Sequence, residues 1–158
     1  CLALMINKAS FQVIVVTTNI DMTMPSLTAD MSQLQQVFTN LFINAADAME
    51  GRGKLHIAAR FDPDRSLFLI RVADTGPGIP QESRDKIFDI FFTTKPAGKG
   101  TGLGLSISQN ILKIHGGHIS FECPPAGGTV FTVELPLSPP GISSEGAVFL
   151  GEEPVFIE

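Results

Sequence analysis

The sequence predicts an α/β protein built as a two-layer α/β sandwich, with a mixed or antiparallel sheet and helices on one of its faces. Amphipathic helical segments lie at 31–49 and at about 103–115, whereas apolar, β-branched runs lie at 11–16, 54–60, 66–73, 118–123 and 128–136. These strands and helices do not alternate strictly, which disfavours a doubly wound parallel sheet. Since 158 residues suffice for one well-filled core, we expect one folded domain.

The first half of the chain contains one strand and one long helix. The apolar run FQVIVV at 11–16 predicts the strand. Asp30 followed by Gln33 resembles a capping box, and apolar residues then recur at helical spacing as far as Met49. Gly51 is expected to end this helix. Because the chain opens with CLALMINKAS and enters a strand almost at once, we expect residues 1–9 to be the end of a helix that belongs to a preceding part of a longer protein.

The second half contains the remaining strands and a long loop. KLHIAAR at 54–60 and SLFLIRVA at 66–73 are expected to pair antiparallel across the turn FDPD. Residues 74–101 predict a functional loop or lid with a short helical turn near 84–88. A helix at about 103–115 ends at Gly116 and Gly117, and two strands follow it. We therefore place the folded domain at 10–137 and a flexible acidic tail or linker at 138–158, which has four glutamates and no lysine or arginine.

Composition excludes several classes of protein. No apolar run is long enough to cross a bilayer and no signal-peptide pattern opens the chain, so we expect a cytoplasmic protein without membrane insertion. The net charge of −5 disfavours nucleic-acid binding, which needs a broad basic surface. Cys1 and Cys123 lack metal-ligand spacing, and we interpret both as free thiols.

The helix at 31–49 carries a polar face beside its apolar one. Gln33, Gln36, Asn40, Asn44 and Asp47 recur at spacings of three and four residues. Asparagine is a poor helix former because its amide competes for backbone hydrogen bonds, so two of them in mid-helix oppose local propensity. Taken alone, this pattern is equally consistent with a solvated face, with hydrogen bonds to a neighbouring loop and with a binding site.

Two glycine-rich stretches are candidate ligand loops. DTGPGIP at 74–80 places Asp74 where a strand ends; by itself it is a turn, and a functional role requires a ligand with a donor, such as the exocyclic amine of adenine. GKGTGLGLSI at 98–107 places glycines before a helix, where backbone amides and the helix dipole favour phosphate. It matches neither the Walker A motif nor G-x-G-x-x-G, and the alternative is a flexible linker.

Between these stretches, IFDIFFTTK at 87–95 crowds three phenylalanines into a loop-like region. Phe88, Phe91 and Phe92 are expected to anchor the loop to the core, which leaves Lys95 free to reach a phosphate. The histidines of HGGH at 115–118 fit a helix end and a strand start better than a metal site.

The order of these motifs resembles one known family. NLFINAADAM, DTGPGIP, IFDIFFTTK, GKGTGLGLSI and GGTVFTVELP are similar to the N, G1, F, G2 and G3 boxes of the sensor histidine kinase catalytic domain, and the resemblance covers roughly residues 10–137. That domain belongs to the GHKL superfamily, which also includes type II topoisomerases, MutL and Hsp90. The NAADAM form is similar to the nitrogen-regulation branch. The resemblance implies a Bergerat-type ATP-binding fold with an ATP lid.

The resemblance also implies ligands and residue roles. ATP and Mg²⁺ would bind together, with Asn44 holding the metal and Asp74 accepting a hydrogen bond from the adenine amine. Lys95 and Lys99 would add charge, the lid would cover the phosphates, and Thr129 would support the adenine end. The full set of implied nucleotide-binding residues is Asn40, Asn44, Asp47, Asp74, Gly76, Gly78, Ile79, Lys95, Lys99, Gly100, Thr101, Gly102, Leu103, Gly104, Leu105 and Thr129.

Two departures from the family pattern, and one difference from the ATPases of the wider superfamily, shape the expected activity. Many members have lysine and tyrosine where this chain has Asp47 and Ala48, so charge on the phosphates must come from the lid. No phospho-accepting histidine motif is present, so we expect a catalytic domain that cannot phosphorylate itself. We also expect it to be monomeric. Its γ-phosphoryl group would go to a histidine on a separate dimerisation domain, and from there to a response regulator receiver domain in a two-component phosphorelay. The superfamily's ATPases place a water-activating glutamate at the position of Asn40, which cannot act as a base. A GHKL ATPase and a catalytically silent nucleotide-binding module are the alternatives.

Overall fold

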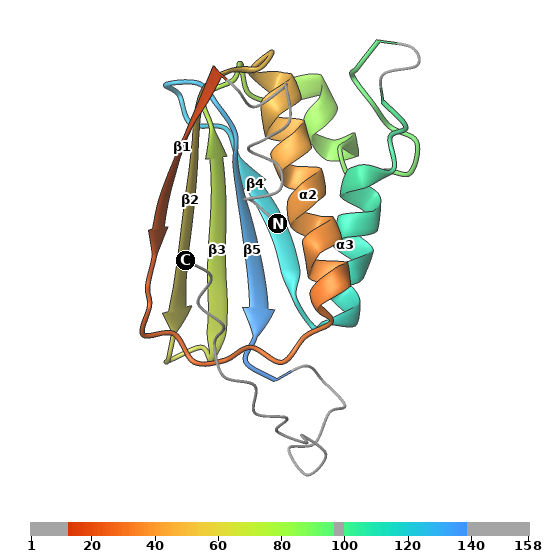
Figure 1. Cartoon of the computed structure of the whole chain (residues 1–158). Coiled ribbons are helices and arrows are strands. Elements are labelled where there is room, and N and C mark those ends of the chain that lie inside the picture. Colours follow the sequence, from red (N-terminus) through yellow and green to blue (C-terminus); the bar gives the residue numbers. More distant parts are fainter. Residues whose placement is uncertain (1–12, 97–99, 139–158) are drawn as a thin grey trace.

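The computed structural model describes residues 13–96 and 100–138. These residues contain a five-stranded sheet in the order β1-β2-β3-β5-β4. Its strands are β1 (Val13–Ile20), β2 (Arg52–Asp62), β3 (Leu67–Asp74), β4 (His118–Glu122) and β5 (Val130–Pro136). The helices α2 (Met31–Ala48) and α3 (Gly104–Ile114) lie side by side over one face of the sheet (Figure 1). The predicted two-layer fold is therefore confirmed.

The sheet is mixed because its first pair of strands is parallel. β1 pairs parallel with β2, whereas β2–β3, β3–β5 and β4–β5 are antiparallel. Parallel neighbours need a crossover connection, and α2 provides it between β1 and β2. The predicted pairing of residues 54–60 with 66–73 is confirmed, although β2 runs on to Asp62 and the turn falls at 63–66. The predictions for residues 1–9 and 139–158 lie outside the described residues.

The core lies between the sheet and the two helices. Its most deeply buried side chains include Val37 and Leu41 on α2, Leu112 on α3, and Leu55 and Val133 on the sheet. The spacing of three to four residues on the helices and of two on the strands places these side chains on facing surfaces. Burial of such aliphatic side chains contributes roughly 1.5–3 kcal/mol each. None of the helices within the described residues is long and apolar enough to cross a membrane.

A histidine completes the N-terminal cap of α2. Asp30 Oδ1 accepts hydrogen bonds from the backbone N–H groups of Ser32 and Gln33, as the capping pattern predicts. The reciprocal bond from Gln33 is not made, and its Oε1 is buried without a hydrogen-bond partner among the described residues. Instead, the Asp30 N–H donates to Nε2 of buried His115, whose Nδ1 lies 2.8 Å from the Ile111 carbonyl oxygen. Since that oxygen only accepts, Nδ1 carries the proton, and the end of α3 is joined to the start of α2.

Candidate functional site

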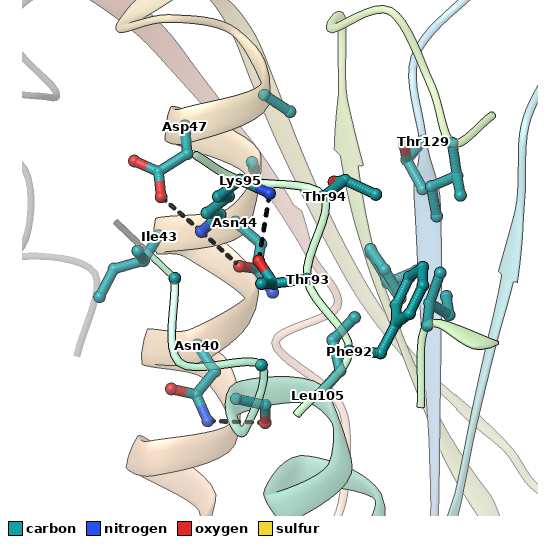
Figure 2. Close-up of a pocket in the computed structure, with 18 of the residues that line it drawn as sticks. Asn40, Ile43, Asn44, Asp47, Phe92, Thr93, Thr94, Lys95, Leu105 and Thr129 are labelled. Atoms are coloured by element: carbon teal, nitrogen blue, oxygen red, sulfur yellow. Dashed lines mark hydrogen bonds and ion pairs between the residues drawn. The ribbon is translucent and has the colours of Figure 1, made fainter. Parts of the chain in front are cut away.

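A cavity of about 530 Å³ opens between α2, the end of β3, the segment 92–96 and the start of α3. Figure 2 shows Thr129 on the sheet side and the polar residues of α2 on the opposite side. The residues implied by the sequence that line this cavity are Asn40, Asn44, Asp47, Asp74, Gly78, Ile79, Lys95, Gly100, Thr101, Gly102, Gly104, Leu105 and Thr129. Gly76 and Leu103 do not line it, and Lys99 lies outside the described residues.

Asp74 is held at one end of the cavity by backbone donors. It is the last residue of β3, and only 9% of its surface is exposed. Its Oδ1 accepts hydrogen bonds from the N–H groups of Gly76 at 2.8 Å and Thr129 at 3.1 Å. Gly76 therefore does not line the cavity itself, but its N–H group orients the Asp74 carboxylate that does. The second oxygen, Oδ2, has no hydrogen-bond partner among the described residues, so it is available as an acceptor.

Burial raises the pKa of the Asp74 carboxyl above its usual value, although the hydrogen bonds from Gly76 and Thr129 oppose the shift. The ionised form is therefore held at a free-energy cost, which is typical of a group kept for binding rather than for stability. A donor that reached the free oxygen would offset this cost.

Glycines allow the backbone to close tightly around Asp74. The Gly128 N–H donates to the Gly76 carbonyl at 2.8 Å, and the Asp74 N–H donates to the Thr129 carbonyl at 2.9 Å. These bonds extend the β3–β5 pairing beyond its last regular pair. Gly128 has φ = +85°, and a Cβ at this position would overlap the Asp74 carbonyl oxygen. Only glycine satisfies both conditions.

The opposite end of the cavity carries a network of polar side chains around Lys95. The Lys95 Nζ atom donates to Asn44 Oδ1 at 3.1 Å and forms an ion pair with Asp47 Oδ2 at 2.6 Å (Figure 2). Asn44 and Asp47 lie about one turn apart on α2, so both oxygens face the same ammonium group. Hard oxygen atoms that surround a cation in this way also suit a small divalent metal ion, provided that a ligand supplies further oxygens. No group of three or more histidine, cysteine or acidic residues within the described ranges could hold a metal alone.

The other mid-helix asparagine has a different partner. Asn40 Nδ2 donates to the Gly104 carbonyl at 3.0 Å and contacts Ser108 Oγ at 3.2 Å. It thereby joins α2 to the first turn of α3 (Figure 2). The polar face of α2 is thus divided: Asn40 binds a neighbouring element, whereas Asn44 and Asp47 engage the lid residue Lys95.

The three phenylalanines behave differently from one another. Phe88 and Phe92 pack against the core as predicted, but Phe91 is 73% exposed and has φ = +68°. Its N–H donates to the Gly102 carbonyl at 3.0 Å, and a Cβ on Gly102 would overlap the Phe91 backbone. The expectation that all three anchor the loop is therefore wrong for Phe91, whose backbone instead braces the glycine-rich segment.

Sequence reasoning missed several apolar residues of the cavity wall. Ile43 and Ala48 on α2, Pro80 and Phe92 in the loops and Phe131 on β5 all line it. Apolar side chains of this kind suit the face of an aromatic ring. Phe92 was predicted as a loop anchor but not as part of a binding site, and Phe131 is indistinguishable by sequence from any other core strand residue.

Comparison with known proteins now identifies the class. Residues 29–139 match the family model of the histidine kinase-, DNA gyrase B- and HSP90-like ATPases, and the chain belongs to this family. Within the family, it is a catalytic domain of the sensor histidine kinase type. Its relatives include the signal transduction histidine-protein kinase AtoS of Escherichia coli (strain K12), at 41% identity over 124 residues, or 78% of this chain.

Other relatives place the chain only loosely within a branch. The sensory histidine kinase/phosphatase NtrB of Rhodobacter capsulatus is 37% identical over 75% of this chain, and the sensor histidine kinase TmoS of Ectopseudomonas mendocina is 38% identical over 73%. Because AtoS is as similar as NtrB, the nitrogen-regulation branch is not singled out. The matched regions span 20% of AtoS, 36% of NtrB and 12% of TmoS, so this chain corresponds to a minor part of each.

Solved structures share the fold. The catalytic domain of the histidine kinase ThkA, in a nucleotide-free form, superposes with a TM-score of 0.70 at 38% identity, over 80% of this chain and 82% of that domain. Full-length ShkA in complex with AMPPNP gives a TM-score of 0.74 at 28% identity, over 87% of this chain and 28% of ShkA. The expected mixed sheet with helices on one face is therefore the fold of this family.

Proposed function

We propose that this domain binds Mg²⁺–ATP and donates the γ-phosphoryl group to a histidine on a separate helical dimerisation domain, which in turn supplies a response regulator receiver domain. The observation that supports it best is the asymmetry of the cavity. One end offers the free carboxylate oxygen of Asp74 beside apolar walls, and the other offers Lys95, Asn44 and Asp47 beside the glycine-rich start of α3. A purine nucleotide has the same asymmetry.

At the purine end, Oδ2 of Asp74 would accept from the exocyclic amine of adenine, while Ile79 and Phe92 flank the ring. Gly78 and Thr129 complete this end of the wall. The structural likeness to ShkA, which was solved with the ATP analogue AMPPNP, supports adenine as the base.

At the phosphate end, Gly100–Leu105 would cover the polyphosphate, and Lys95 would neutralise part of its charge. Lys99 would add a second positive charge. Asn44 would hold Mg²⁺, which keeps several waters and needs few protein ligands. The metal would supply charge neutralisation on the phosphates.

Transfer would rely on positioning and electrostatics. The described residues that line the cavity include no histidine, cysteine or glutamate, and the two carboxylates among them, Asp47 and Asp74, are engaged with Lys95 and with backbone N–H groups. The three histidines of the chain, at 56, 115 and 118, do not line the cavity. Asn40 occupies the position of the ATPase glutamate, and its amide is already bonded to Gly104 and Ser108. The acceptor must therefore come from another domain, and intrinsic hydrolysis should be slow. We infer that the domain acts as a monomer in the cytoplasm, where ATP is available, and that the histidine-bearing domain provides dimerisation.

Transfer of label from the γ-position of ATP tests this function. The purified domain is mixed with the helical dimerisation domain of the parent protein, and label on that domain's histidine is followed over time. Acid-labile label on the partner and none on this chain is the expected result. Steady release of phosphate without the partner would establish the ATPase alternative instead, and nucleotide binding without transfer or turnover would indicate a silent module.

Replacing Asn44 with alanine is expected to remove most of the gain in ATP affinity that Mg²⁺ provides, at least about tenfold, because a ligand to a charged group is lost. Calorimetric titration with ATP, with and without Mg²⁺, measures this gain. Asn110→Ala, an exposed asparagine on α3 that does not line the cavity, is the matched control. An unchanged magnesium dependence in Asn44→Ala would show that Asn44 is not the metal ligand.

A further inference from the structure

Asp47 places a negative charge where the proposed function needs a positive one. Its carboxylate lies on the cavity wall at the end where the polyphosphate would bind. An acid beside phosphates repels them, so an unpaired Asp47 would weaken ATP binding. The carboxylate is not unpaired, because Oδ2 lies 2.6 Å from the Lys95 ammonium. The side chains of Lys95 and Asp47 are 29% and 44% exposed, so this ion pair alone adds little stability.

The stem of Lys95 is fixed by its own segment. The Lys95 N–H donates to Thr93 Oγ1 at 3.1 Å, which fixes the backbone at Lys95. A Cβ added to Gly100 would lie 2.5 Å from Thr93 Oγ1 and 3.1 Å from Lys95 Cβ, so Gly100 packs directly against both residues. The backbone and stem are thus placed by the lid, whereas the ammonium group is oriented by α2.

We propose that Asp47 is a positioning residue, not a nucleotide ligand: it holds the Lys95 ammonium at the phosphate end of the cavity. This inference rests on the proposed function. The second acceptor for Lys95, Asn44 Oδ1, is the atom assigned above to the metal. If Asn44 Oδ1 binds the metal ion, Asp47 Oδ2 is the acceptor that still holds the Lys95 ammonium group in place. α2 thereby supplies the carboxylate and the lid supplies the ammonium group of an ion pair. This pair places one positive charge beside the phosphates.

A double-mutant cycle tests whether Asp47 positions Lys95 or only repels the phosphates. Removal of its charge should weaken ATP binding in the first case and strengthen it in the second. Lys95→Met is expected to weaken Mg²⁺–ATP binding about tenfold and to leave adenosine binding unchanged. Asp47→Asn is expected to weaken ATP binding about threefold in the wild-type background, because a neutral amide oxygen holds the ammonium group less firmly than a carboxylate does. In the Lys95→Met background the same change should leave ATP affinity unchanged or raise it, because only repulsion is then removed.

The measurements are calorimetric titrations with ATP and with adenosine. Asp47→Glu should recover most of the lost affinity, and Lys113→Met, an exposed lysine in the last turn of α3, controls for the loss of one positive charge. Tighter ATP binding by Asp47→Asn in both backgrounds, or equal losses for ATP and adenosine, would overturn the proposal. If the wild-type domain failed to bind ATP, the proposed function itself would fall; ATP binding without coupling in the cycle would refute only the role of Asp47.

Discussion

Asp74→Asn is expected to weaken ATP binding by about 1.5–3 kcal/mol, or roughly 10- to 150-fold, without destabilising the nucleotide-free domain. The amide oxygen of asparagine can still accept from the N–H groups of Gly76 and Thr129, so the backbone around the site is preserved. In place of the Asp74 Oδ2 atom, asparagine has an NH₂ group. This group is a donor, so it cannot accept a hydrogen bond from the adenine amine. Calorimetric titration with ATP measures the loss.

The stability of the same variant follows from the raised pKa of Asp74. A carboxyl whose pKa is higher in the folded state favours folding below its unfolded-state pKa, and loses that contribution as the pH rises through the folded-state pKa. At neutral pH the ionised Asp74 therefore costs folding free energy, and the neutral asparagine removes this cost. Urea unfolding at pH 7 should show equal or higher stability for Asp74→Asn. A loss of stability that matched the loss of affinity would mean that Asp74 is structural.

Gly128→Ala is expected to lower the free energy of unfolding by about 2–5 kcal/mol, because it combines a left-handed φ with a steric overlap. The overlap is with the Asp74 carbonyl oxygen, so the strand end that carries the carboxylate must move. ATP affinity should fall with stability. Chemical unfolding and ATP titration of the same preparation measure both effects.

The neighbouring glycine provides a matched control. Gly127 also has a left-handed φ of +96°, but a Cβ there would meet only the Gly76 carbonyl oxygen, at 3.7 Å. Gly127→Ala should therefore show the conformational cost, about 1–2 kcal/mol, and should retain ATP binding. Equal effects of the two substitutions on ATP affinity would contradict the claim that close packing of Gly128 positions Asp74.

Much of the fold and part of the cavity could be predicted because the signals are local. The strand that ends at Asp74, the helix capped by Asp30 and the glycines before α3 each leave a pattern within a few residues. The parallel pairing of β1 with β2 leaves no such pattern, so the sequence allowed a mixed or an antiparallel sheet.

Contacts between distant residues could not be predicted. The bond from Asp30 to His115 joins residues 85 positions apart, and the ion pair between Asp47 and Lys95 spans 48 positions. Propensity and periodicity carry no information about such pairs. The exposure of Phe91 was also missed, because a hydrophobic residue is expected inside unless the backbone turns it outward, and its positive φ is visible only in the folded chain.

Comparison of ATP with GTP tests the central claim most directly, since both nucleotides carry the same phosphates and differ at the base. Asp74 Oδ2 would meet a donor in ATP and a carbonyl oxygen in GTP, so titration of the wild-type domain in Mg²⁺ should show at least about tenfold tighter binding of ATP. Equal affinity for ATP and GTP would contradict the placement of adenine against Asp74.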